Sequence, residues 1–394
     1  MPTSLVEALF PPKNHVFRGV VRRGALEPFI PKSNSLDESI HDFVSRRFGN
    51  HVAENMISAL VHGIFAGDSR ILSVRSCFPS LWEAEQKYGS VVRSLIVSSL
   101  SKQAPESFSP DISVKEADFI KRIKSSSIYS FKNGLETLTN AIEADLKQNY
   151  PNVTILKNTE VTQINPPTSP NAPIVIETKN GEKFNATNVI SSISSGALAP
   201  LLPENSPLGL LLAVNPAVNV VVVNLNFENP PNTSILPISG FGYLVPRTQP
   251  SPVIGVIFDS ETIPEQSQGT PHITRLTCMM GGARFNEIFG SVDTFDKSAC
   301  LETAVATVRK DLNITAPLLS SHVSLHKNCI TQYTVGHAQR LQKIDAILRQ
   351  EFDGRLAVAG SSYLGVGVND CVLGARDIAR RLQTSQSVTG LERA

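Results

Sequence analysis

Residues 360–376 have the sequence GSSYLGVGVNDCVLGAR, and this stretch decides the fold of the C-terminal part of the chain. A short apolar run over residues 356–359 precedes it and is typical of a buried strand. Apolar residues then recur at helical spacing up to Leu382. We therefore predict a strand, a glycine-rich loop and a helix in this order.

The loop has the composition of a site for a flat anionic ligand. Gly365 and Gly367 let the backbone approach such a ligand without an intervening Cβ. The helix, capped in this prediction by Asn369 or Asp370, presents free N–H groups and partial positive charge, which would stabilise a reduced flavin. The alternative is a plain strand-to-helix turn, since the spacing is not the dinucleotide-binding G-x-G-x-x-G. The residues by themselves leave both interpretations open.

The part of the sequence before this loop divides into helices followed by strands. Ser35 and Glu38 form a capping-box pattern, so we predict a helix that begins there and a helical unit over residues 35–125. One of its helices is predicted over about residues 81–100. Helices grouped early, strands grouped late and a final strand–loop–helix indicate α/β architecture with α+β character and more than one domain.

The central part of the chain has strand periodicity. Short strands are predicted over residues 153–156, 161–164 and 174–177, and Asn180-Gly181 predicts a hairpin turn because both residues tolerate positive φ. Residues 208–225 are the most apolar run, but Asn215, Pro216 and Asn219 interrupt them. We interpret that run as a pair of strands and not as a membrane span.

Composition excludes several function classes. A net charge of +1 in 394 residues provides no field for nucleic acid, so we expect no nucleic-acid partner. The five cysteines are scattered without a C-x-x-C pair, which is typical of reduced, buried thiols. His322 and His326 lie on a predicted strand, where that spacing does not serve one ion, so we assign no metal.

Several segments, in order along the chain, resemble the protoporphyrinogen oxidases, the FAD-dependent enzymes of haem biosynthesis. The resemblance is strongest over residues 360–376, and it includes the stretches 65–86 (FAGDSRILSVRSCFPSLWEAEQ), 194–202, 240–246 (GFGYLVP) and 325–337 (LHKNCITQYTVGH). Flavoproteins of the amine oxidase and phytoene desaturase kinds share the general C-terminal architecture. The helical stretch at residues 76–86 argues against them.

The resemblance implies a multi-domain flavoprotein fold of the amine-oxidase-like type. Such a fold has a FAD domain built from discontinuous segments, a sheet-containing substrate domain and a helical domain that docks on a membrane. The boundaries that we expect are 1–34 for a connector, 35–125 for the helical membrane-associated domain, 126–200 for a FAD-domain segment, 201–330 for the β-rich substrate-binding domain and 331–394 for the C-terminal FAD-domain segment.

Matched position by position, the resemblance implies cofactor-binding residues. Val366, Gly367 and Val368 would contact the flavin end of FAD, with Ser361 close by. Val161 matches a strand valine that the family packs near the adenine, although an ordinary strand valine is the equal alternative.

The stretch 240–246 matches the family's substrate-side loop. It would place Phe241, Gly242 and Leu244 near the tetrapyrrole, since a glycine and apolar side chains suit a large flat ring. A simple hairpin edge is the alternative. No catalytic side chain is assigned, because the flavin takes hydride and the macrocycle's own nitrogens release protons. We expect structural roles for Arg70, Arg75, Glu85 and His337.

The implied activity is the oxidation of protoporphyrinogen IX to protoporphyrin IX with FAD and oxygen. The implied location is the inner mitochondrial membrane, as a peripheral protein, and a homodimer is an expectation because the family is often dimeric. The family's N-terminal G-x-G-x-x-G unit, which binds the FAD pyrophosphate, is not found in these 394 residues. The alternative is therefore a truncated, non-catalytic paralogue or gene-model fragment that binds only tetrapyrrole or membrane.

Overall fold

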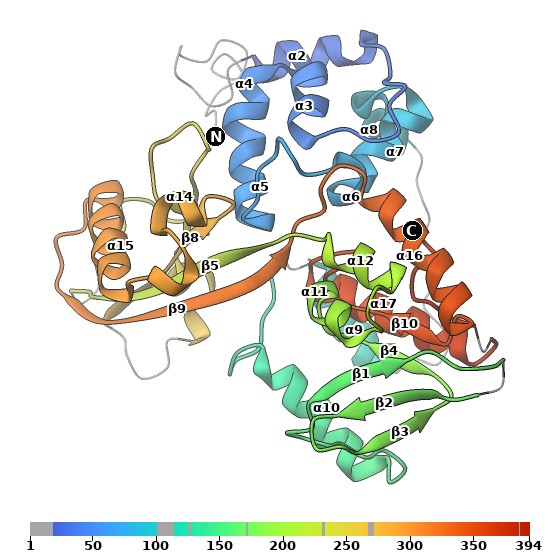
Figure 1. Cartoon of the computed structure of the whole chain (residues 1–394). Coiled ribbons are helices and arrows are strands. Elements are labelled where there is room, and N and C mark those ends of the chain that lie inside the picture. The colour runs from blue at the N-terminus through green and yellow to red at the C-terminus, as the bar shows by residue number, and fades with distance from the viewer. Residues whose placement is uncertain are drawn as a thin grey trace.

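A bundle of short helices forms the upper part of the molecule in Figure 1, as the apolar periodicity predicts. The computed structural model describes residues 19–100, 114–125, 128–170, 172–230, 233–266, 272–385 and 387–394. The bundle consists of α2 (Val20–Leu26), α3 (Ile40–Phe48), α4 (Asn50–Val52), a π-helical turn (Ala53–Ile57), α5 (Ser58–Phe65), α6 (Val74–Cys77), α7 (Pro79–Tyr88) and α8 (Val91–Leu100). Its core is apolar and includes Ile40, Phe43, Val44, Val61, Phe65, Leu72 and Trp82.

Two helix ends differ from the prediction. The helix expected from Ser35 begins at Ile40, because the Ser39 side chain accepts a hydrogen bond from the Asp42 N–H at 3.0 Å and caps it. The helix expected over residues 81–100 is two helices, α7 and α8. Gly89 ends α7 with φ of +70°, a left-handed conformation that is common where helices stop.

Buried charges join the helices of the bundle. Arg47 is fully buried between the carboxylates of Glu27 and Glu85, which are also fully buried. Glu27 also accepts hydrogen bonds from Ser90 Oγ and from the Val91 N–H, so it holds the start of α8. The hydrogen bonds and ion pairs of these groups offset the free-energy cost of removing their charges from water. They form only when the helices that carry the groups are packed as they are here.

A five-stranded antiparallel sheet forms the second unit, in the order β6 (Gly242–Leu244), β7 (Val253–Ile257), β8 (Ile273–Gly282), β5 (Ala217–Glu228) and β9 (Leu318–Thr331). The helix α15 (Lys297–Leu312) covers one face and buries apolar side chains there, among them Val221, Val223, Leu225, Leu276, Ala304 and Val308. The turns α13 (Asp259–Thr262) and α14 (Phe285–Phe289) follow β7 and β8. One packed face agrees with alternating apolar residues along the strands.

Residues 208–225, predicted as two strands, are a helix followed by a strand. The helix α12 (Pro207–Ala213) begins with proline at its first position, and the Ser206 side chain caps it by accepting from the Gly209 N–H at 3.4 Å. Leucine runs of this kind have no period that separates a short helix from a buried strand, and the cap decides between them.

The third unit combines segments from the middle and the end of the chain. Strands β4 (Val189–Ser191) and β10 (Leu356–Val358) pair in parallel. Strands β1 (Val161–Asn165), β2 (Ile174–Thr178) and β3 (Lys183–Ala186) form an antiparallel sheet, with the predicted turn at Asn180-Gly181 between β2 and β3. The helices are α9 (Val114–Ser125), α10 (Glu136–Asn149), α11 (Ser195–Leu198), α16 (His337–Phe352) and α17 (Val368–Leu382).

The predicted strand at residues 153–156 is not a strand. This segment makes no β-ladder with any described strand, and the side chains of Val153, Ile155 and Leu156 are exposed. Its β-branched residues suit a strand, but a strand also needs a neighbour to pair with.

Two long strands connect the sheet unit to the third unit, as Figure 1 shows at the centre of the molecule. β5 starts and β9 ends at the same point, where the Gln332 N–H donates to the Pro216 carbonyl at 2.8 Å. This double connection brings the chain back to the strand, loop and helix that close the sequence.

No helix among the described residues is long and apolar enough to cross a bilayer. The same residues contain no group of three or more His, Cys, Asp or Glu side chains that could hold a metal ion.

Candidate functional site

The glycine-rich loop between β10 and α17 folds back onto the first turn of its own helix. Gly367, and not Asn369 or Asp370, is the N-cap of α17, and its N–H donates to Asp370 Oδ2 at 3.2 Å. A Cβ at Gly365 would overlap the Asp370 side chain. The predicted cap was wrong because Asp370 is the third residue of the helix, from which its carboxylate reaches back to the N–H of the N-cap residue.

The end of α17 presents both donors and apolar surface. The first N–H groups of a helix have no partner within the helix, so they concentrate partial positive charge there. Val368 and Val372 on this first turn are each more than half exposed. A flat ring with a polar, electron-rich edge fits this combination, although the Asp370 carboxylate offsets part of the positive charge.

Hydrogen bonds from distant elements hold the loop in place. The Tyr333 hydroxyl donates to the Ser361 carbonyl at 2.7 Å, and the Ser195 N–H donates to Ser362 Oγ at 3.0 Å. Val366 packs against the core of the helical bundle. The loop is therefore preorganised between the bundle and the third unit.

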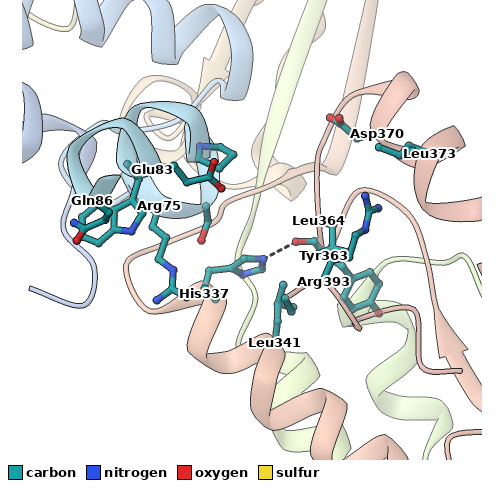
Figure 2. A pocket seen from close by; sticks show the side chains of 15 residues that line it. Arg75, Glu83, Gln86, His337, Leu341, Tyr363, Leu364, Asp370, Leu373 and Arg393 are labelled. Carbon is teal, nitrogen blue, oxygen red and sulfur yellow. Dashed lines mark hydrogen bonds between the residues drawn. The ribbon is translucent and has the colours of Figure 1, made fainter. Parts of the chain in front are cut away.

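His337, the first residue of α16, supports the loop from one side (Figure 2). Its Nε2 lies 2.8 Å from the Tyr363 carbonyl, and its ring stacks on Tyr333 at 4.2 Å between centroids. Burial lowers the pKa of His337 to about 4, so the imidazole is neutral at physiological pH and Nε2 carries the hydrogen. This geometry gives His337 a supporting role and not that of a base.

Val161 lies at the start of β1, in the three-stranded sheet. It packs at the edge of the hydrophobic core that also buries Tyr363 of the loop. Its predicted contact with the adenine of FAD stays a prediction.

Phe241, Gly242 and Leu244 lie together on the wall of a cavity of about 960 Å³. The cavity lies between the β6–β7 hairpin and the helix that runs through the π-helical turn into α5. The residues that complete it are Asn55, Met56, Ile57, Ala59, Leu60, Gly63, Ile64, Tyr243, Pro246, Ile254, Gly255, Val256, Ile257 and Met279.

Two glycines define the shape of this cavity. Gly242 has φ of +146°, and a Cβ there would overlap the carbonyl oxygen of Val256 on the neighbouring strand. Gly63 on α5 lies under Leu244, so that a Cβ would come within 2.7 Å of Leu244 Cδ2. The strand and the helix therefore approach more closely than side chains would allow.

One helical segment contributes both to the cavity and to the core on which the loop packs. Met56 and Ile57 line the cavity, and both pack, like Val366 of the loop, against the hydrophobic core of the bundle. The cavity and the loop therefore share one supporting core.

Comparison with known proteins gives the family. The family model for flavin-containing amine oxidoreductases matches residues 3–383. Protoporphyrinogen oxidase from Homo sapiens is 34% identical over 393 residues, which span all of this chain and 77% of the human protein. The chain belongs to the protoporphyrinogen oxidase family.

A second relative and a solved structure agree with this assignment. Protoporphyrinogen oxidase from Schizosaccharomyces pombe is 32% identical over 91% of this chain and 71% of that protein. The crystal structure of a candidate protoporphyrinogen oxidase from Exiguobacterium sp. 255-15 superposes with a TM-score of 0.71 at 21% identity, covering 97% of this chain and 77% of that one. The expected amine-oxidase-like flavoprotein fold is confirmed.

A member of this family is a flavin-dependent oxidoreductase, and its cofactor is FAD. The start of α17 fits the flavin end of FAD because it offers N–H groups beside the exposed valines Val368 and Val372, while the missing Cβ atoms of Gly365 and Gly367 make room for the Asp370 side chain. Val366, Gly367 and Val368 would hold that end by backbone and apolar contacts, beside Ser361. The sequence has no G-x-G-x-x-G turn to which the pyrophosphate could be assigned.

The sequence pointed to the hairpin side of the cavity but missed its helical side. Met56, Leu60 and Ile64 have helical spacing, which by itself indicates only a buried helix face. The signal that could have identified them is Gly63 among them, since a glycine inside an apolar helix often marks a close approach.

Proposed function

We propose that this chain oxidises protoporphyrinogen IX to protoporphyrin IX with FAD and molecular oxygen, as a step of haem biosynthesis. The observation that carries the proposal is the apolar cavity that contains Phe241, Gly242 and Leu244. This chain is 34% identical over its whole length to a protein that is named protoporphyrinogen oxidase.

The walls of the cavity suit a large apolar ring. Leu244 and Met279 offer apolar side chains to the ring, and the lining of the cavity is apolar over most of its described residues. Apolar walls exclude water from the reacting carbon atoms, which protects the transferred hydride. When bound, FAD accepts hydride from the substrate and passes the electrons to oxygen.

Proton transfer needs no side chain in this cavity. None of its lining residues is charged, and the hydroxyl of Tyr243 is held by Asp311 Oδ2 at 2.9 Å. Burial and the bond to Asp311 raise the pKa of Tyr243 well above its ordinary value of 10.0. The protons therefore leave from the macrocycle's own nitrogens.

The location proposed for the protein is the inner mitochondrial membrane, with peripheral attachment. The support is the apolar outer face of α8, where Leu95 is 66% exposed and Leu100 is 78% exposed, with Ile96 between them. Such a face is typical of helices that lie on an interface without crossing it. A homodimer stays an expectation.

The test uses the purified chain with FAD in excess. A bound-flavin absorption band and oxygen-dependent appearance of porphyrin fluorescence from protoporphyrinogen IX are expected. The variant Gly367→Val, whose Cβ would lie 3.0 Å from Asp370 Oδ2 and disturb the cap at the start of α17, should abolish both signals. The control Gly374→Ala lies on α17 with open space around it and should change neither. Porphyrin binding without flavin or turnover would favour the alternative of a non-catalytic tetrapyrrole-binding protein.

A further inference from the structure

The apolar cavity has one polar corner, at Asn55. Apart from Tyr243, whose hydroxyl is bonded to Asp311, Asn55 has the only polar side chain among the lining residues that the structure describes. A tetrapyrrole is apolar over most of its area but carries carboxylates on propionate side chains. The cavity therefore offers a polar contact for a propionate at Asn55 and apolar contacts for the ring elsewhere.

A π-helical turn brings Asn55 to the cavity. The turn Ala53–Ile57 interrupts the helix between α4 and α5, and the extra residue in such a turn shifts the side chains around the helix axis. Asn55 and Met56 both line the cavity as a result. π-helical turns are frequent at functional sites.

The amide of Asn55 is fixed in orientation by neighbours from two units. Its Nδ2 donates to the His51 carbonyl at 2.9 Å, and its Oδ1 accepts from Thr248 Oγ1 at 3.1 Å. Nδ2 has a second hydrogen, which faces His51 Nδ1 at the longer distance of 3.3 Å. A carboxylate is a stronger acceptor than an imidazole nitrogen, so a carboxylate placed beside Nδ2 would compete with His51 for this hydrogen.

The nearby cation is already neutralised. Arg247 precedes Thr248, and its guanidinium pairs with Asp68 while its N–H donates to Ser58 Oγ at 3.2 Å. A carboxylate at this corner would therefore meet an amide donor and not a free positive charge.

We propose that Asn55 is a positioning residue that donates a hydrogen bond to a propionate carboxylate of the tetrapyrrole. The inference rests on the proposed function, and it assigns the orientation of the ring: one propionate at the π-helical turn, and the apolar edge against β6 and β7. Recognition by an amide makes binding depend on the carboxylate but only weakly on salt.

The test measures porphyrin binding, which does not require FAD. Protoporphyrin IX and its dimethyl ester are titrated into wild-type protein and into Asn55→Leu, Asn55→Asp and Asn55→Gln, and porphyrin fluorescence gives the Kd. Asn55→Leu should raise the Kd of the diacid roughly tenfold, the effect of one hydrogen bond to a charged group. It should raise the Kd of the ester much less, because the ester carbonyl is an uncharged and weaker acceptor. Asn55→Asp should raise the Kd of the diacid further, and Asn55→Gln should restore part of the affinity.

The matched control is Asn149→Leu, at the exposed C-terminal end of α10, where the amide Nδ2 donates to Asp145 Oδ1 at 2.8 Å. It should change neither Kd. Equal weakening of diacid and ester by Asn55→Leu would overturn the inference, since it would show a wall without carboxylate recognition. Unchanged affinity would overturn it as well. Failure of the wild type to bind either porphyrin would overturn both the inference and the proposed function.

Discussion

Leu244 rests directly on the backbone of Gly63, and a Cβ added at Gly63 would lie 2.7 Å from Leu244 Cδ2. Gly255 approaches Leu244 from the other side, where a Cβ would lie 2.8 Å from the same atom. One side chain of the hairpin is thus held between a helix of the bundle and a strand of the sheet. The width of the apolar cavity depends on this contact.

Substituting Gly63→Ala should push Leu244 into the cavity without unfolding the protein. Alanine is favoured over glycine in a helix by about 0.5–1 kcal/mol, and Leu244 is a flexible side chain that can move. We expect an unchanged thermal unfolding midpoint and weaker binding of protoporphyrin IX, measured by fluorescence titration. Gly374→Ala, in a helix with open space, should leave binding unchanged. A strong loss of stability with normal binding in the remaining folded protein would contradict this view of Gly63.

Gly242→Ala should damage the sheet edge itself. Gly242 has a φ of +146°, and a Cβ there would overlap the Val256 carbonyl oxygen. We therefore expect the free energy of unfolding to fall by about 3 kcal/mol or more and the yield of folded protein to decrease. Gly181→Ala has positive φ of +83° in open space and serves as the control for backbone strain without overlap. Chemical denaturation gives both values, and equal losses in the two variants would argue against the overlap.

Arg47→Met should destabilise the helical bundle strongly. It leaves the buried carboxylates of Glu27 and Glu85 without the cation that they share. Removing one partner of a buried ion pair lowers the free energy of unfolding by about 3–5 kcal/mol. The exposed pair of Lys147 and Glu143 on α10 provides a control, and Lys147→Met should leave the unfolding midpoint unchanged. A small effect of Arg47→Met in urea unfolding would show that the carboxylates become protonated instead.

Acid should weaken the same bundle. Burial alone would raise the pKa of Glu27 and of Glu85, but other interactions hold both below the ordinary value of 4.5. The pKa of Glu27 is lowered by hydrogen bonds from Ser90 and from two backbone N–H groups of α8, and by the charge of Arg47. Hydrogen bonds from Arg46 and Arg47 lower the pKa of Glu85. A carboxylate with a lowered pKa stabilises the fold above the unfolded value and loses that contribution as the pH falls below it. Stability measured between pH 6 and pH 3 should therefore fall most steeply below about pH 4.5. A flat profile in that window would exclude this linkage.

His337 should give a second pH dependence at higher pH. Because burial lowers its pKa from 6.5 to about 4, the unfolded chain binds a proton more readily than the folded chain between these values. Stability should decline by about 2 kcal/mol between pH 7 and pH 5 from this residue. His337→Gln should remove that part of the slope, and an identical slope in wild type and variant would show that the imidazole is not the group responsible.

The sequence alone was sufficient to predict the family, the fold class and the importance of two segments, residues 240–246 and 360–376. The glycines of residues 360–376 and of residues 240–246 are required by local geometry: Gly365 by the approach of Asp370, and Gly242 by its neighbour strand. Local requirements leave a signature in the sequence because one residue type satisfies them. The hairpin at Asn180-Gly181 was predictable for the same reason.

Only the tertiary structure decided which helix face completes the cavity and which residue gives it a polar corner. Met56 and Leu60 have the same spacing as any buried helix face, and Asn55 reaches the cavity only because a π-helical turn rotates it there. The long antiparallel strands β5 and β9 lead from the sheet that carries the hairpin to the unit that carries the glycine-rich loop. Hydrophobic periodicity specifies that a surface is buried, but it does not specify the surface that buries it.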